Sequence, residues 1–274
     1  MCELRRWKRP ERAIGGLALA CVALPFALSA AAAQTVVDLE LVLAVDVSGS
    51  MDQQEQALQR RGYVEAFAHP EVVDAIRSGP YGRIAVTYVE WAGPTSQATV
   101  LPWTLVEDAA SAGDFAAGLA EAPMSRFRGT SISGALTFAA SLFQDNGYEG
   151  LRRAVDVSGD GANNAGAPVT PIRDEVVAAG IVVNGLPITL GPSLQTAVGA
   201  PDLAAYYRDC VIGGPGAFVI AVMEPGQLFE AIRRKLVLEI AGLPPRVVSA
   251  AATTRSAGDC LVGERLRRLW EREP

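Results

Sequence analysis

The chain has 274 residues, half of them hydrophobic, and a formal net charge of −6 at pH 7. This length suffices for one domain of ordinary size with additional segments. Residues 1–33 hold five basic and two acidic side chains and so contribute +3, which leaves −9 for the remainder. Because nucleic-acid binding depends on neutralising phosphates with Lys and Arg, this acidic body argues against a nucleic-acid partner. It suits a soluble protein with a cation site.

Residues 1–33 have the layout of a secretory signal peptide. Residues 5–12 are basic, residues 13–30 are apolar and rich in Ala and Leu, and residues 31–33 are three alanines that fit a small-x-small cleavage pattern. We therefore predict an exported protein, periplasmic or secreted. Its mature chain would begin near Gln34 and contain no membrane span.

Two alternatives to cleavage remain open. The apolar run is nearly long enough to span a bilayer as an uncleaved anchor. Cys21 follows a weak lipoprotein-like stretch, in which the expected leucine has the wrong offset. The Arg5-Arg6 pair permits a twin-arginine route, but the residues after it fit that signal poorly, so the general export route is preferred.

The first predicted elements surround an apolar strand at residues 39–46. A helix follows over residues 52–68, since apolar side chains recur there among Gln and Arg without an early Gly or Pro. Pro70 ends it, and a short helical turn covers residues 71–77. Strands at 84–91 and 98–103 are close enough to form a hairpin.

The rest of the chain alternates between helices and strands. The predicted helices are 111–120, one opened by Thr130, 172–179, 202–210 and 227–241, and the predicted strands are 151–157, 181–188 and 217–223. This alternation, together with few aromatic residues and abundant alanine, predicts an α/β domain. Its sheet would be mostly parallel, with one antiparallel edge hairpin.

Export would leave two cysteines in the mature chain, Cys210 and Cys260. In an oxidising compartment we expect them to form one disulfide, with two unpaired thiols as the alternative. The bond would close a loop of about 50 residues, worth roughly 4 kcal/mol in the chain-entropy model. It would tie the C-terminal tail, residues 243–274, back to the domain.

Short oxygen-bearing side chains gather where strands end or helices begin. Asp46, Ser48 and Ser50 close the first strand, Thr130 opens a helix after a glycine, and Asp160 follows the strand at 151–157. Carboxyl ends of strands form the ligand crevice of open α/β sheets. Carboxylates and hydroxyls are the hard donors that Mg²⁺ prefers, so the pattern predicts a cation site. Helix capping is the alternative, and it is strongest for Thr130 taken alone.

This ordered pattern resembles the von Willebrand factor A-type (VWA) domain. Asp-x-Ser-x-Ser after a buried strand, Gly-Thr at a helix start and a later strand ending in Asp-Gly are the three parts of its metal-ion-dependent adhesion site, or MIDAS. The chain is also similar to an uncharacterised family of secreted proteobacterial VWA proteins. The segments that carry this second resemblance are 41–50, 82–87, 156–164 and 211–218.

The resemblance covers about Val37 to Gly242, and we assign the domain to residues 34–242. It implies a Rossmann-like fold of six strands in the order 3-2-1-4-5-6, with one antiparallel edge strand and helices on both faces. It also implies a divalent cation, preferably Mg²⁺ with Mn²⁺ and Ca²⁺ as alternatives, and a protein partner that presents Glu or Asp to the metal. One departure is Gly159, where many VWA domains have Thr.

A metal-assisted hydrolase is the alternative function. Two carboxylates and a hydroxyl on a metal could activate water towards phosphate or ester groups. Against it, no second Asp lies two positions after Asp46, and the single histidine, His69, precedes a proline at a helix end. No nucleophile elbow, P-loop or zinc pattern is present. We therefore expect a non-catalytic binding module, with a structural envelope protein bearing a vestigial site as a third option.

Other polar groups have less specific interpretations. Asn163 and Asn164 either line the rim of the site or serve turn chemistry. The basic clusters Arg152-Arg153 and Arg233-Arg234-Lys235 are expected on solvated faces.

Overall fold

The structure, a computed structural model, describes residues 34–190, 202–243 and 259–271. The predicted signal peptide and its cleavage site lie outside these residues. The elements are β1 (Thr35–Val37), β2 (Leu39–Asp46), α1 (Gln53–Phe67), α2 (Pro70–Arg77), β3 (Ile84–Trp91), β4 (Gln97–Val106), α3 (Ala109–Glu121), α4 (Ile132–Ser141), β5 (Tyr148–Gly150), β6 (Arg153–Gly159), α5 (Val169–Ala178), β7 (Ile181–Pro187), α7 (Leu203–Tyr206), the π-helical η1 (Tyr207–Val211), the 3₁₀ turn η2 (Pro225–Gln227), α8 (Leu228–Ala241) and α9 (Val262–Trp270).

Five strands form the central sheet in the order β4-β3-β2-β6-β7. β2 lies in the middle and pairs in parallel with β3 on one side and with β6 on the other. β7 continues the parallel sheet beyond β6, whereas β4 runs antiparallel to β3 at the opposite edge. These strands take the first five positions of the expected order, with the antiparallel strand at the edge as predicted. β1 and β5 form a separate parallel pair.

The predicted sixth strand, residues 217–223, is not formed as a continuous element, so the prediction of six strands is wrong. Two isolated parallel bridges stand in its place: Gly185 with Val219, and Ile188 with Val222. Pro187, the last residue of β7, lies between the bridged residues Gly185 and Ile188 and has no N–H. It cannot donate the ladder hydrogen bond that would join the bridges into a strand.

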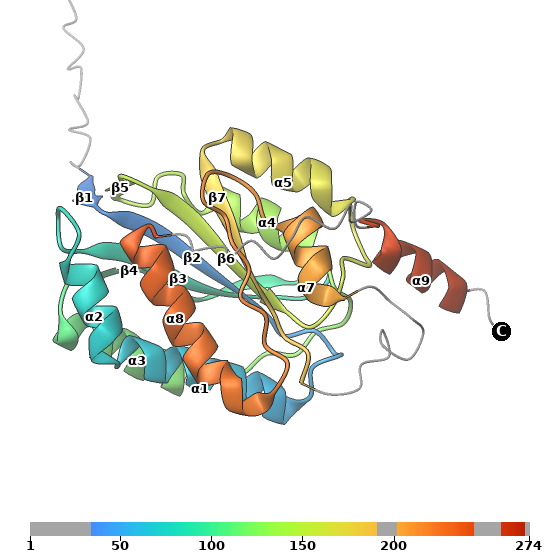
Figure 1. Ribbon diagram of the computed structural model, residues 1–274, viewed down its shortest axis with the longest axis horizontal. Coiled ribbons are helices and arrows are strands. Elements are labelled where there is room, and N and C mark those ends of the chain that lie inside the picture. Colours follow the sequence, from blue (N-terminus) through green and yellow to red (C-terminus); the bar gives the residue numbers. More distant parts are fainter. Residues whose placement is uncertain (1–33, 191–201, 244–258, 272–274) are drawn as a thin grey trace, which may run out of the picture. The chain divides into compact units, whose positions relative to one another are not determined.

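Both faces of the sheet are covered, as expected. The apolar side chains at odd-numbered positions of β2 pack in one core with α1, α2, α3 and α8. Val42 and Ala44, which point the opposite way, pack in a second core with α4, α5 and the α7–η1 segment. Figure 1 shows the two groups of helices on opposite faces of the sheet. A strand buried on both sides is apolar without interruption, which is why residues 39–46 are easily recognised as a strand.

Local signals fix the helix ends. Asp52 caps α1, and Glu55 completes a capping box with it. His69 caps α2 through its side chain, and Pro70 occupies the first turn. α8 ends at Gly242, which adopts the left-handed conformation with φ 65°.

The C-terminal part contains α9, a helix that the sequence analysis did not predict. The predicted disulfide is confirmed: Cys210 on η1 is bonded to Cys260, two residues before α9. In the part of the chain that the structure describes, no helix has both the length and the apolar character that crossing a membrane requires.

Candidate metal site

The candidate site lies where the order of the strands reverses. Asp46 is the last residue of β2, and Asp160 directly follows β6, the parallel neighbour of β2. The chain after β2 turns towards β3, whereas β6 lies on the other side of β2. This is the crevice in which open α/β sheets bind ligands. The fold therefore brings two carboxylates, 114 positions apart in sequence, to one edge of the sheet.

Hydrogen bonds join four of the five predicted ligands. Ser48 N donates to Asp46 Oδ1 over 2.7 Å, and the Ser48 and Ser50 hydroxyls are 2.9 Å apart. Ser50 Oγ donates to Asp160 Oδ1 over 2.7 Å. Asp46 and Ser48 are buried, whereas Ser50 is exposed, so the cluster reaches solvent on the Ser50 side.

The fifth predicted ligand, Thr130, ends a loop of residues 122–130, which we call the Phe127 loop. Phe127 forms an isolated parallel bridge with Ser48, and its N–H donates to Val47 O over 3.2 Å. The Phe127 loop therefore runs beside the turn that carries the two serines. Thr130 is 4% exposed. Within the described residues, no hydrogen bond joins its hydroxyl to the other four side chains.

The backbone of Thr130 is held on both sides. Its N–H donates to Asn164 Oδ1 over 3.1 Å, and its carbonyl accepts from Asn164 N over 2.8 Å. The capping role belongs to its neighbour, because Ser131 is the N-cap of α4 and its hydroxyl accepts from Gly134 N. The capping alternative for Thr130 is therefore wrong, and its hydroxyl is not used to begin the helix.

Burial raises the pKa of both carboxyl groups, Asp46 and Asp160. Desolvation raises the pKa of Asp46 well above its usual value, and the neighbouring Asp160 raises it further, against the hydrogen bond from Ser48 N. Burial likewise raises the pKa of Asp160 to about 6, against the hydrogen bond from Ser50 and with a further rise from Glu55. Asp46 Oδ2 is buried and has no hydrogen-bond partner among the described residues.

A divalent cation fits this donor set. A positive charge would stabilise both carboxylates, and Asp46 Oδ2 would gain a partner. The described residues contain no group of three or more His, Cys, Asp or Glu side chains that could hold a metal ion. The candidate ligands are instead two carboxylates and three hydroxyls, which suit hard cations. His69 takes no part, because its ring caps α2 through Nδ1 and contacts Arg233 through Nε2.

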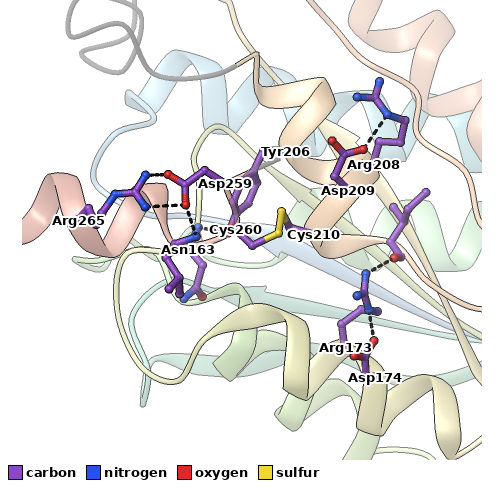
Figure 2. Close-up of a disulfide and its surroundings, with 12 residues drawn as sticks. Asn163, Arg173, Asp174, Tyr206, Arg208, Asp209, Cys210, Asp259, Cys260 and Arg265 are labelled. Carbon is purple, nitrogen blue, oxygen red and sulfur yellow. Dashed lines mark hydrogen bonds and ion pairs between the residues drawn. A yellow bond between two sulfur atoms is a disulfide. The ribbon is translucent and has the colours of Figure 1, made fainter. Parts of the chain in front are cut away.

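Asn163 connects the site to the C-terminal helix. Its Oδ1 accepts from Ser133 N over 3.0 Å, and its Nδ2 donates to Glu264 Oε1 on α9 over 2.7 Å. Its backbone N–H donates to the Tyr206 hydroxyl over 3.2 Å. Figure 2 shows Asn163 and Tyr206 beside the disulfide that precedes α9. Asn163 and Asn164 do more than form a turn. Asn164 holds the backbone of Thr130, and Asn163 holds the first turn of α4, which follows it.

Comparisons with known proteins agree with this fold. A model of the family DUF1194, described as a protein of unknown function, matches residues 36–244. A search of curated proteins gives no match. The chain spans about half the length of the first solved structures it matches, or 49% of proximal thread matrix protein 1 from the mussel byssus, with 18% identity over 76% of this chain and a TM-score of 0.52.

Three further matches are equally distant in sequence. The same mussel protein "with zinc occupied MIDAS motif" shares 15% identity over 76% of this chain and 47% of its own, with a TM-score of 0.52. The von Willebrand factor type A protein from Catenulispora acidiphila shares 15% over 74% and 43%, with a TM-score of 0.50. The pilus adhesin SpaC from Lactobacillus rhamnosus GG shares 14% over 76% and 30%, with a TM-score of 0.51. At these identities the likeness concerns the fold alone.

Proposed function

The chain belongs to the DUF1194 family and has the von Willebrand factor A-type fold, and we propose that it is an exported, non-catalytic binding module. In this proposal Asp46, Ser48, Ser50, Thr130 and Asp160 hold a divalent cation. When bound, the cation supplies an open position for a Glu or Asp of a protein partner.

The observation that carries the proposal is the unpartnered Asp46 Oδ2. A buried carboxylate oxygen without a hydrogen-bond partner is costly, because its desolvation is not compensated. The cost is removed if a cation lies against it. The chain from Asp46 through Ser48 and Ser50 to Asp160 orients the remaining donors around the same place.

Mg²⁺ is the proposed cation, with Mn²⁺ and Ca²⁺ as alternatives, because carboxylate and hydroxyl oxygens suit all three. The zinc-occupied MIDAS motif named for the mussel protein supports divalent-cation binding in general. The organisation into a signal peptide at 1–33, a domain at 34–242 and a tail at 243–274 is part of the proposal. The disulfide supports export, because such bonds persist in oxidising compartments.

Metal titration tests the site. We expect Asp46→Asn and Asp160→Asn each to weaken Mg²⁺ binding more than about 100-fold, since losing an outer-shell partner alone costs roughly 10–100-fold. Isothermal titration of the exported, purified protein measures this, with Mn²⁺, Ca²⁺ and Zn²⁺ in parallel. Asp74→Asn, which changes an exposed carboxyl of α2, is the matched control and should bind as wild type does. Equal affinities in all four proteins would show that the cation binds elsewhere.

Partner capture tests the function. Pull-down from an envelope extract should recover a protein that is lost with EDTA and with Asp46→Ala, but kept with Asp74→Asn. Capture that survives both EDTA and Asp46→Ala would contradict a metal-dependent module. A screen with generic phosphate and ester substrates tests the non-catalytic part, and turnover that disappears in Asp46→Ala would favour the hydrolase instead.

A further inference from the structure

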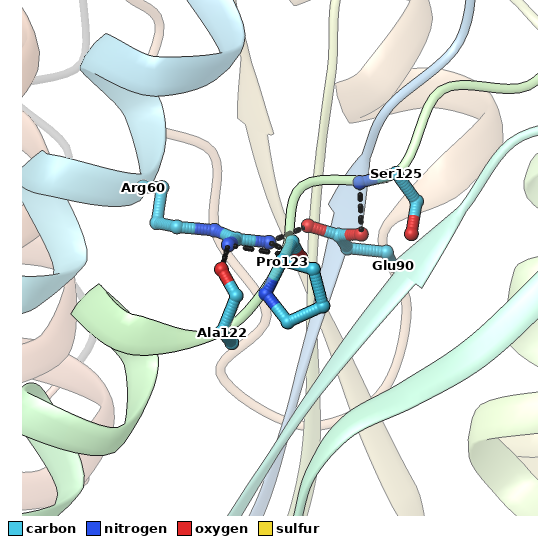
Figure 3. Close-up of polar contacts among 5 residues, drawn as sticks. All are labelled: Arg60, Glu90, Ala122, Pro123 and Ser125. Atoms are coloured by element: carbon cyan, nitrogen blue, oxygen red, sulfur yellow. Dashed lines mark hydrogen bonds and ion pairs between the residues drawn. The ribbon is translucent and has the colours of Figure 1, made fainter.

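The Phe127 loop begins on a buried ion pair. Arg60 on α1 donates to Glu90 on β3, and both side chains are almost inaccessible to solvent. The same guanidinium donates to the carbonyls of Ala122 and Pro123, and Ser125 N donates to the second oxygen of Glu90 (Figure 3). These hydrogen bonds hold the start of the Phe127 loop against the ion pair. The pair itself is kept together because losing either partner would leave a buried charge uncompensated.

The middle of the loop lies against the serine turn of the metal site. Arg126 Nη2 donates to Gly49 O over 3.2 Å, and Gly49 lies between the two candidate serine ligands. A cavity of about 570 Å³ opens at this place and is lined by Gly49, Arg126, Phe127 and Arg128. The cavity therefore adjoins the exposed side of the metal site.

Both positively and negatively charged side chains lie near the exposed side of the site. Arg126 and Arg128 are exposed, and in the described part of the chain neither forms an ion pair. At the start of α1, Asp52 is the N-cap and Glu55 lies in the first turn, and the Glu55 charge acts on Asp160. The two arginines therefore give this surface a local positive charge on a chain of net charge −6.

We propose that this surface, Gly49 with Arg126, Phe127 and Arg128, binds an acidic segment of a protein partner. The inference rests on the proposed function: one carboxylate of the segment occupies the metal, and a second, a few residues away, pairs with the arginines. A guanidinium binds carboxylate in a planar, two-pronged geometry. Phe127, 39% exposed, offers an apolar contact between the two charged positions.

The distribution of charge favours a short acidic segment over an extended polyanion. A polyanion would need a continuous basic surface to neutralise it, whereas this surface has two arginines and the start of α1, which acts on the same site, carries Asp52 and Glu55. The acidic residues of the segment therefore extend from the metal towards the Phe127 loop and away from α1.

Fluorescently labelled peptides test the inference. The probes have a Gly/Ser background with one Glu, or with two Glu separated by zero to four residues. Their anisotropy is titrated with the exported, purified protein in millimolar Mg²⁺ at low and at high salt. We expect the best two-Glu peptide to bind about three- to tenfold tighter than the one-Glu peptide, with an advantage that shrinks as salt rises, because rim charges are screened.

The variants separate this surface from the metal site. Arg126→Gln with Arg128→Gln should remove the advantage of the second Glu and leave Mg²⁺ affinity and one-Glu binding within about threefold of wild type. Arg77→Glu, at the end of α2, is a matched charge control and should keep the advantage. An advantage that survives in the double variant, or one-Glu and two-Glu peptides that bind equally, overturns the inference. So does tighter, salt-dependent binding of a sulfated polysaccharide than of any peptide.

Failure of the proposed function gives a different pattern. If the second Glu helps and the double variant removes that help, but EDTA and Asp46→Ala change nothing, the arginine surface stands and the metal-dependent function is wrong. If EDTA abolishes one-Glu binding but the second Glu adds nothing, the metal function stands and this inference is wrong.

Discussion

Position 159, one residue before Asp160, is glycine because no side chain fits there. A Cβ atom at this position would lie 2.8 Å from the Tyr207 hydroxyl and 2.9 Å from Asp46 Oδ2. Tyr207 lies on η1 and is fully buried. The Gly159 departure from other VWA domains is therefore explained by a bulky aromatic residue that fills the space beside Asp46. A sequence pattern around Gly159 contains no information about a tyrosine 48 positions later.

We expect Gly159→Ala to destabilise the protein by about 1–3 kcal/mol, because overpacking a buried site forces its neighbours to move. Asp46 is one of those neighbours, so Mg²⁺ affinity should fall as well. Tyr207→Phe removes the nearer clashing atom, and the double variant should recover part of the loss as a favourable coupling energy. Urea denaturation and metal titration of the four proteins measure both effects. If the changes in the free energy of unfolding of the two single variants simply add in the double variant, Tyr207 is not what excludes a side chain at position 159.

Among the elements, α8 departs most from expectation. Lys235 was predicted on a solvated face, but it is fully buried and forms ion pairs with Asp156 on β6 and with Glu239 one turn later. Residue type alone favours a solvated position for three consecutive basic side chains. Helical spacing gives the correct answer, because Leu228, Ile232 and Lys235 recur at the interval of a buried stripe. Arg152 is exposed, as expected, and its guanidinium donates to the carbonyls that end α8.

This buried cluster predicts a pH dependence of stability. Burial, reinforced by Asp156, raises the pKa of Glu239 to about 7, although Lys235 opposes the rise. Between about pH 4.5 and 7 the folded chain keeps a proton that the unfolded chain releases, so the free energy of unfolding falls as pH rises. The fall attributable to Glu239 is at most about 3 kcal/mol.

Glu239→Gln should reduce the fall in melting temperature between pH 5 and pH 7.5. Asn184 still has an oxygen to donate to, and Asp156 still pairs with Lys235. Burial also raises the pKa of Asp160 to about 6, so without added metal a smaller fall of the same sign should remain. Thermal unfolding followed by circular dichroism across this range is the measurement. Parallel curves for wild type and variant would rule out Glu239 as the group responsible.

At the scale of the whole molecule, the disulfide brings the C-terminal helix to Asn163, beside the candidate metal site. Gly263 on α9 packs so closely that a Cβ there would lie 2.1 Å from Asn163 O, and Glu264 accepts from the Asn163 side chain. Arg265 pairs with Asp259 at the start of the same helix. α9 thus packs against the segment that holds the candidate site and is not a separate appendage.

Reduction of the disulfide, or Cys210→Ala with Cys260→Ala, should lower the free energy of unfolding by about 2–4 kcal/mol. It should also weaken Mg²⁺ binding, because α9 would no longer be held against Asn163. Glu264→Gln keeps the disulfide and an acceptor for Asn163, so it should bind Mg²⁺ nearly as wild type does. Denaturation and metal titration with and without reductant provide the measurements. Unchanged metal affinity after reduction would show that α9 does not support the site.

Much of the fold was predictable because its signals are local. Apolar runs mark strands buried on both faces, and capping residues such as Asp52 mark helix starts. The interruption of the predicted sixth strand was not predictable in the same way. It depends on Pro187 in the neighbouring strand, a residue that is compatible with the end of β7 itself.

The type of fold, the pair of cysteines and the five candidate ligands follow from the amino-acid sequence alone, because each depends on residue types and spacings within short segments. The three-dimensional arrangement was needed to show that Ser50 connects to Asp160, that Ser131 rather than Thr130 caps α4, and which residues surround the candidate site. Those outcomes depend on contacts between segments far apart in the chain. Local patterns do not specify such contacts, because they are selected by packing once the sheet has formed.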